Sequence, residues 1–138
     1  MTIWQRLTTL TVTVSLTLMG LLFQASVAQS AVAKMTKEDL RAKLDSPDVV
    51  IVDMRLGQDW KASEEKIKGA IRVDPEAVES LAAKYPKDKT LVLYCACPDE
   101  FTSARGPQKL IDKGFTNVYA LKGGWHEWHR AQFPIETK

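Results

Sequence analysis

An α/β domain with a mainly parallel central sheet flanked by helices is the fold class that this sequence predicts. Short apolar runs alternate with segments that carry helix caps, which is the pattern of strand–helix–strand units. The runs at 49–52 and 91–94 are continuous, which is typical of strands buried on both faces. The length of 138 residues and the charged fraction of 26% suit one globular domain.

The first 33 residues differ from the rest of the chain. Arg6 is their only charged residue, and an apolar stretch at 7–23 follows it. Small-residue sequences suited to a signal peptidase end at Ala28 and at Ala33. We therefore predict that residues 1–28 are a signal peptide, with cleavage after Ala33 as the alternative. The alternative is an uncleaved membrane anchor, in which residues 7–23 would span a bilayer. A stretch of this length is at the lower limit for a transmembrane helix.

The charge balance argues against a nucleic-acid-binding protein, and the cysteine count argues against a scaffold held by disulfides. The formal net charge is +2 without a basic block, so nucleic acid is not an expected partner, and a membrane is one only if the N-terminal segment is uncleaved. Export would place the domain in the periplasm of a bacterium, or otherwise outside the cell, where conditions are oxidising. Cys95 and Cys97 are the only cysteines, and a bridge between residues two apart is strained in most backbones. The pair therefore suggests chemistry or packing rather than cross-linking.

One domain is expected over residues 35–138. Its first helix is predicted over 37–44, because Thr36 suits an N-cap and acidic residues fill the first turn. A turn separates this helix from the strand at 49–52. Residues 57–67 are polar and are expected to form a loop with a short helix.

Strands and helices are expected to alternate through the rest of the chain. The predicted strands cover 69–73, 91–94 and 117–121. The predicted helices cover 75–84, 103–113 and a last segment that includes 125–131. Ligands of open parallel sheets bind off the carboxyl ends of the strands. The segments at 53–55, 96–101 and 122–124 follow strands, so we expect them to converge around Cys95.

Cys95 directly follows a buried strand and precedes a polar loop that leads into a helix. The thiolate is the reactive form of cysteine, whose ordinary pKa is about 8.5. Backbone N–H groups in such a loop, and the unpaired ones at a helix N-terminus, would stabilise an anion on this sulfur. The residues alone leave a second interpretation open, which is a buried cysteine that only fills the core.

Five segments, in this order, resemble the rhodanese family of sulfurtransferases. They lie at 49–55 (Val-Val-Ile-Val-Asp-Met-Arg), 67–73, 91–95, 103–115 and 118–128. The resemblance implies the family's three-layer fold, a parallel sheet flanked by helices. It also implies that Cys95 is the catalytic residue, which takes a sulfane sulfur from thiosulfate, a polysulfide or a persulfide. A thiophilic acceptor, such as a protein thiol, then removes that sulfur, with no metal or cofactor.

The resemblance also assigns roles to residues around Cys95. Structural support is expected from four residues, two of them at the family's Asp-x-Arg position, where they would bond loop backbone beneath the site: Asp53, Arg55, Gly123 and Gly124. Substrate contacts are expected from the loop and the start of the next helix: Ala96, Cys97, Asp99, Glu100, Phe101, Thr102, Ser103 and Arg105.

The loop departs from the family pattern in length and charge. The stretch from Cys95 to Ser103 is two residues longer, and Thr102 stands where the family often has an arginine. Asp99 and Glu100 bring negative charge, which disfavours an anionic donor such as thiosulfate. Their alternative role is to stabilise the dipole of the helix that follows.

The start of the next helix leaves two further questions open. Arg105 is the cation nearest the loop, and it would either steer an anion or face solvent. Gly106 and Pro107 predict an irregular first turn.

Phosphatase chemistry needs an arginine at a short fixed spacing from the cysteine, and Phe101 occupies that place. We therefore disfavour a phosphatase.

Cys97 has three interpretations: a bystander, a cysteine that resolves a Cys95 persulfide, or a soft-metal ligand together with Cys95. Two rival functions remain open. One is a thiol–disulfide or metal-handling protein that uses both cysteines, and the other is a catalytically silent binding module. The spacing of His126 and His129 is a weak indication of a zinc site, and no metal is expected there.

Overall fold

The computed structural model describes residues 32–97 and 101–138, with 101–104 described by their backbone alone. These residues belong to one compact unit. The predicted signal peptide, Asp99 and Glu100 lie outside the described residues. Within the described ranges, no helix is long and apolar enough to cross a membrane.

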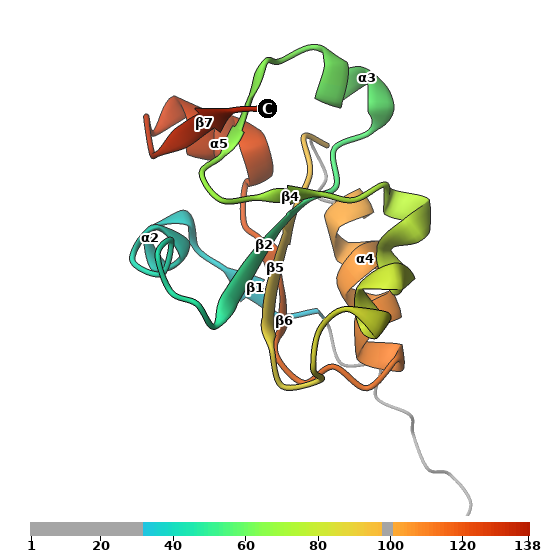
Figure 1. The fold of residues 1–138 in the computed structure, drawn as a ribbon. Coiled ribbons are helices and arrows are strands. Elements are labelled where there is room, and N and C mark those ends of the chain that lie inside the picture. The colour runs from blue at the N-terminus through green and yellow to red at the C-terminus, as the bar shows by residue number, and fades with distance from the viewer. Residues whose placement is uncertain (1–31, 98–100) are drawn as a thin grey trace, which may run out of the picture. The chain divides into compact units, whose positions relative to one another are not determined.

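A five-stranded parallel sheet forms the centre of the unit, in the order β1-β6-β5-β2-β4 (Figure 1). The strands are β1 (Lys34–Met35), β2 (Val49–Asp53), β4 (Ile71–Arg72), β5 (Thr90–Tyr94) and β6 (Val118–Leu121). β2 and β5 pair in register along their whole length, so that Asp53 and Tyr94 end side by side. The predicted α/β class with a parallel sheet is confirmed.

Helices cover both faces of the sheet, which creates two hydrophobic cores (Figure 1). The 3₁₀ helix η1 (Pro75–Ala83) and α4 (Phe101–Asp112) cover one face, whereas α2 (Lys37–Arg41) and α5 (Gly124–Arg130) cover the other. Leu91 and Leu93 of β5 pack into the first core, and Val92 and Tyr94 pack into the second. Because successive side chains of a strand point to opposite faces, a strand between two helical layers must be apolar throughout.

Short strands are the elements that the sequence did not reveal. Residues 57–67, predicted as a loop with a short helix, form α3 (Gly57–Lys61) and then β3 (Glu65–Ile67). β3 pairs antiparallel with β7 (Ile135–Thr137) in a separate two-stranded sheet. β1 was missed as well. These strands have two or three residues each, so they are too short for an alternating pattern to stand out.

Several helix boundaries differ from the prediction. α2 ends at Arg41 rather than near residue 44, and the segment at 75–83 is a 3₁₀ helix. α4 begins at Phe101, two residues before the predicted start at residue 103. The expected irregular first turn is wrong, because α4 runs on through Gly106 and Pro107. Gly106 lets the helix approach the sheet closely, since a Cβ there would lie 2.6 Å from the sulfur of Met54.

Candidate active site

Cys95 lies at the carboxyl end of β5, where its backbone and its sulfur are both held. It is 1% exposed. Its Sγ accepts a hydrogen bond from the backbone N–H of Cys97 at 3.3 Å, and its carbonyl oxygen accepts one from the backbone N–H of Trp125 at 2.9 Å. An N–H aimed at the sulfur favours the charged form of a thiol.

The turn before α5 fits against Cys95 only because it is made of glycines. Gly123 and Gly124 have φ values of +76° and +53°, a backbone region that favours glycine. A Cβ on Gly124 would lie 2.3 Å from the carbonyl oxygen of Cys95. The absence of a side chain at Gly124 therefore lets the N-terminus of α5 reach the cysteine.

The carboxyl end of β2 is joined to the same place through the backbone. The N–H of Met54 donates to the carbonyl oxygen of Tyr94 at 2.8 Å, directly before Cys95. The N–H of Val73, which follows β4, donates to the carbonyl oxygen of Asp53 at 3.1 Å. The structure thus places the segments at 53–55 and 122–124 beside Cys95, as the sequence predicted, whereas most of the third segment, 96–101, lies outside the described residues.

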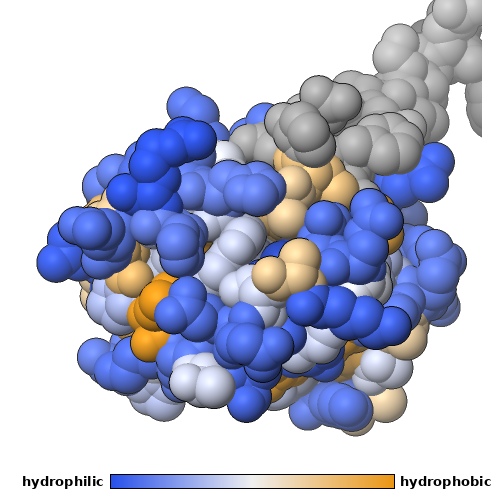
Figure 2. Space-filling view, turned by 90° about the horizontal axis from the view of Figure 1, so that it is seen from above, coloured by the Kyte–Doolittle hydropathy of each residue, from blue (hydrophilic) through white to orange (hydrophobic). Residues whose placement is uncertain are grey.

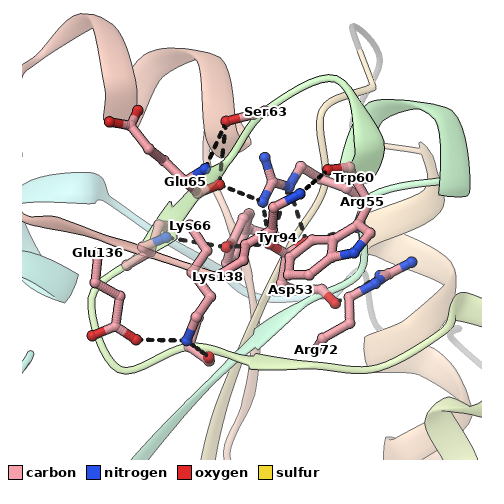
Figure 3. Close-up of polar contacts among 12 residues, drawn as sticks. Asp53, Arg55, Trp60, Ser63, Glu65, Lys66, Arg72, Tyr94, Glu136 and Lys138 are labelled. Carbon is pink, nitrogen blue, oxygen red and sulfur yellow. Dashed lines mark hydrogen bonds and ion pairs between the residues drawn. The ribbon is translucent and has the colours of Figure 1, made fainter.

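A buried ion pair forms the base of this region (Figure 3). Asp53 and Arg55 are both fully buried. Asp53 Oδ2 accepts hydrogen bonds from Arg55 Nη2 at 2.7 Å and from the Tyr94 hydroxyl at 2.5 Å. Arg55 Nη2 also donates to the carbonyl oxygen of Glu65 at 2.9 Å. The sequence predicted that this pair bonds loop backbone beneath the site; among the described residues, the Arg55 side chain binds the backbone carbonyl of Glu65 in β3.

Aromatic rings surround the guanidinium group of Arg55. Its central carbon lies 4.4 Å from the ring centre of Trp125 and 5.1 Å from that of Trp60. Arg72 lies 5.1 Å from the same Trp60 ring. Among the described residues, no atom forms a hydrogen bond with the buried Arg55 Nη1. Contact with ring faces compensates part of the cost of burying the charge.

Tyr94 is the site residue that sequence reasoning missed. Burial first, and then the negative charge of Asp53, raise the pKa of Tyr94 well above its ordinary value. The phenol therefore stays protonated, donates to Asp53, and accepts the N–H of Ile67 at 3.2 Å. The available signal was a hydroxyl group at the last position of an otherwise apolar strand.

The other predicted site residues are distributed as follows. Ala96 is buried, Cys97 is half-buried, and Arg105 is exposed on α4. Phe101, Thr102 and Ser103 form the first turn of α4, and their side chains lie outside the described part.

His129, one of the two histidines of α5, has an acidic neighbour. His129 Nε2 lies 3.4 Å from a Glu65 carboxylate oxygen at the surface. No group of three His, Cys, Asp or Glu side chains suited to a metal occurs in the described ranges.

Comparison with known proteins shows which family this chain is similar to. Residues 36–131 match the model of the rhodanese-like domain. The protein named thiosulfate sulfurtransferase GlpE from Glaesserella parasuis is 26% identical over 103 residues, which are 75% of this chain and 92% of that protein. The protein of the same name from Pseudomonas savastanoi is 33% identical over 88 residues, 64% of this chain and 78% of the relative.

A solved structure shows the same fold. The crystal structure of a full-length protein from Lactobacillus plantarum superposes with a TM-score of 0.68 at 22% identity, covering 76% of this chain and 88% of that one. The family match spans more than half of the sequence and includes every element of the site described above. This chain therefore belongs to the rhodanese-like domain family.

Proposed function

We propose that this protein is an exported sulfurtransferase that carries a sulfane sulfur on Cys95. The observation that carries the proposal is the position of Cys95, at the end of β5, with the N–H of Cys97 directed at its sulfur. Relatives named thiosulfate sulfurtransferase support it. Seen from the end of the unit where the strands have their carboxyl ends, the described residues present a mostly hydrophilic surface (Figure 2).

The reaction consists of two displacements at sulfur. The Cys95 thiolate attacks the sulfane sulfur of thiosulfate, the sulfur–sulfur bond breaks, and sulfite leaves with the electron pair. The thiolate of an acceptor then attacks the outer sulfur of the Cys95 persulfide, and Cys95 leaves as thiolate. Covalent catalysis of this kind divides one difficult transfer into two easier ones. The buried ion pair and the glycine turn hold Cys95 in place through both steps.

Intact-protein mass spectrometry tests this function directly. After incubation with thiosulfate, the mature protein should gain the mass of one sulfur atom, and a thiol should remove it. Cys95→Ser should gain nothing, whereas Cys97→Ser should still be loaded. A wild-type protein that gains no sulfur from thiosulfate, a polysulfide or a persulfide would contradict the proposal.

A second candidate function uses Cys97 as well. Its N–H contacts the Cys95 sulfur, and its own side chain is half-buried, so both thiols lie on one short turn. A protein of this kind would form a reversible Cys95–Cys97 disulfide or hold a soft metal. Counting free thiols after mild oxidation distinguishes the two functions. A rapidly formed, reversible disulfide favours the second candidate, and two independent thiols favour the first.

Export, with cleavage after Ala28, is part of the proposal. The carbonyl oxygen of Ala33 accepts a hydrogen bond from the N–H of Ala120 at 2.9 Å, beside β1. Cleavage after Ala33 would remove this acceptor, whereas cleavage after Ala28 would keep it. N-terminal sequencing of the protein recovered from the periplasm of a bacterial host should begin at residue 29. Recovery of the intact N-terminus in the membrane fraction would contradict cleavage.

A further inference from the structure

A cavity of about 450 Å³ lies between η1 and α4, beside the end of β2. Small-molecule sites commonly have volumes of about 300–1,000 Å³. Met54, Leu56 and Pro75 form the apolar floor of the cavity, and most of the rest of its lining consists of polar and charged residues of η1 and α4. Neither cysteine, nor either member of the buried ion pair, lines it. The proposed reaction at Cys95 therefore does not account for this cavity.

Leu56 is an apolar residue at a position where a helix favours a polar one. It is the N-cap of α3, its side chain forms no capping hydrogen bond, and it is 41% exposed. Serine, threonine, asparagine or aspartate at an N-cap binds a free backbone N–H of the helix, which leucine cannot do. Neither helix capping nor burial in a core therefore accounts for this leucine. It does extend the apolar floor of the cavity.

Close packing holds the floor against α4. Gly106 lines the cavity from α4, and a Cβ there would lie 2.6 Å from the sulfur of Met54. Met54 is 1% exposed, so its neighbours hold its side chain in place. Glycine lowers the stability of a helix interior, so this residue serves the close approach of α4 to the floor. The apolar part of the cavity is thus preformed, and little ordering of the protein opposes the binding of a ligand.

Opposite charges meet at the rim of the cavity. Lys109 Nζ on α4 lies 3.9 Å from Glu76 Oε2 on η1, and the Glu76 side chain is 93% exposed. A pair so long and so exposed is weak, so a ligand can insert between the two groups at little cost. Arg105 and Asp112 of α4 add one charge of each sign to the lining. The complement to this cavity is a small molecule with an apolar body and two neighbouring charges of opposite sign.

We propose that the cavity binds a free α-amino acid with an apolar side chain, at a site separate from Cys95. The carboxylate and the ammonium group of such a molecule are attached to the same carbon atom as its side chain, so all three reach one small cavity together. The carboxylate faces Lys109, the ammonium group faces Glu76, and the side chain contacts the apolar floor. This binding does not depend on sulfur transfer.

Isothermal titration calorimetry of the mature protein with L-leucine tests the proposal. Leucine should bind with a dissociation constant of about 1 mM or lower. Leucinamide lacks the carboxylate and 4-methylpentanoate lacks the ammonium group, and each should bind about fivefold more weakly than leucine. Glycine lacks the apolar side chain and should bind at least about tenfold more weakly.

Two lysine substitutions on α4 form a matched pair. Lys109→Gln should weaken leucine binding about fivefold and leave leucinamide binding unchanged, because leucinamide has no carboxylate to interact with the lysine. Lys113→Gln removes the neighbouring contact between α4 and η1, from Lys113 to Glu79 at 3.6 Å, which lies outside the cavity. It should leave both affinities unchanged.

Leu56→Ser separates ligand binding from stability. Serine caps a helix better than leucine does, so this variant should unfold at a temperature no lower than that of wild type. It should nevertheless bind leucine about fivefold more weakly, because part of the apolar floor is lost. Unchanged affinity in this variant would contradict the role of Leu56.

Three other results would overturn the proposal. The first is a protein that binds no leucine at millimolar concentration. The second is equal affinity for leucine, leucinamide and 4-methylpentanoate, or an equal effect of Lys109→Gln and Lys113→Gln. The third is loss of leucine binding in Cys95→Ser, because the ligand would then lie at the cysteine. Sulfur loading of Cys95 is measured separately, so its failure would leave this site untouched.

Discussion

Asp53 and Arg55 form a fully buried ion pair at the point where β2 ends. The backbone N–H of Arg55 and its Nε also donate to Asp53 Oδ1, at 3.0 and 3.1 Å. The carboxylate thus holds its own chain in a tight turn while it accepts the hydroxyl of Tyr94. At the scale of single residues, this pair connects the end of β2 to β3 and β5.

Removal of one member of the pair should destabilise the protein strongly. Arg55→Met should lower the free energy of unfolding by about 3–5 kcal/mol, because Asp53 would keep a buried charge without its partner. Asp53→Asn combined with Arg55→Met should cost less than the sum of the two single changes. Urea unfolding of the two single variants and the double variant measures this. Additive costs would contradict a direct coupling.

The raised pKa of Tyr94 predicts that the protein loses stability at alkaline pH. Its pKa is raised in the folded protein, by burial first and then by Asp53, above the ordinary value of 10.0. Below about pH 10 the Tyr94 phenol is protonated in both the folded and the unfolded protein, so its contribution to stability is intact. Above that pH the phenol ionises first in the unfolded protein, so stability falls as the pH rises. The stability advantage of wild type over Tyr94→Phe should therefore shrink between pH 9 and pH 11. An advantage that stays constant would contradict this assignment.

At the scale of elements, the junction between β6 and α5 holds the backbone of Cys95. β6 ends at Leu121, two glycines with positive φ reverse the chain, and α5 begins against the carbonyl oxygen of Cys95. α5 then buries Trp125 and Trp128 in the core. A short helix is thereby anchored by its N-terminal backbone and by two large rings.

Gly124→Ala should affect both stability and sulfur loading. The added Cβ would lie 2.3 Å from the Cys95 carbonyl oxygen, so the strand end must move, at an expected cost of about 3 kcal/mol. Gly69→Ala is the matched control, because Gly69 has a φ of +77° but open space around it. It should cost only about 1 kcal/mol of backbone strain and leave persulfide formation unchanged. Thermal unfolding and intact mass after thiosulfate treatment measure both effects.

At the scale of the whole molecule, the C-terminal residues brace the region above the site. β7 pairs with β3, whose Glu65 carbonyl oxygen binds Arg55. The Lys138 Nζ donates to the carbonyl oxygen of Trp60 at 2.7 Å and lies 4.4 Å from its ring centre (Figure 3). Segments about seventy positions apart in the sequence thus meet beside the buried ion pair.

Deletion of residues 135–138 should therefore loosen the site without unfolding the sheet. The loss of β7 should cost about 2 kcal/mol, the net value of a few hydrogen bonds, and should speed amide exchange in β3 more than in β5. Lys138→Ala is the control for the side chain alone and should have a smaller effect. Equal exchange in the deletion variant and wild type would contradict this role of β7.

The sequence by itself determined the α/β class, the long parallel strands and the position of Cys95 at a strand end. These features are local, because apolar runs and caps are read over a few consecutive residues. It did not determine β1, β3 and β7, or the early start of α4. Isolated strands of two or three residues are not stable, and Glu65–Ile67 becomes a strand only where Ile135–Thr137 lies beside it.

The site likewise contains residues that the sequence could identify and residues that only the tertiary structure shows. Cys95 could be named from its place after a buried strand, and Asp53, Arg55 and the glycines from the resemblance to the rhodanese family. The partners of Asp53 and Arg55 could not, because Tyr94, Glu65 and the tryptophan rings come from other strands and helices. Met54 also lines a cavity of about 450 Å³ between η1 and α4, and how closely these two helices pack decides its size. Packing brings together residues far apart in the sequence, and only the tertiary structure shows which of them meet.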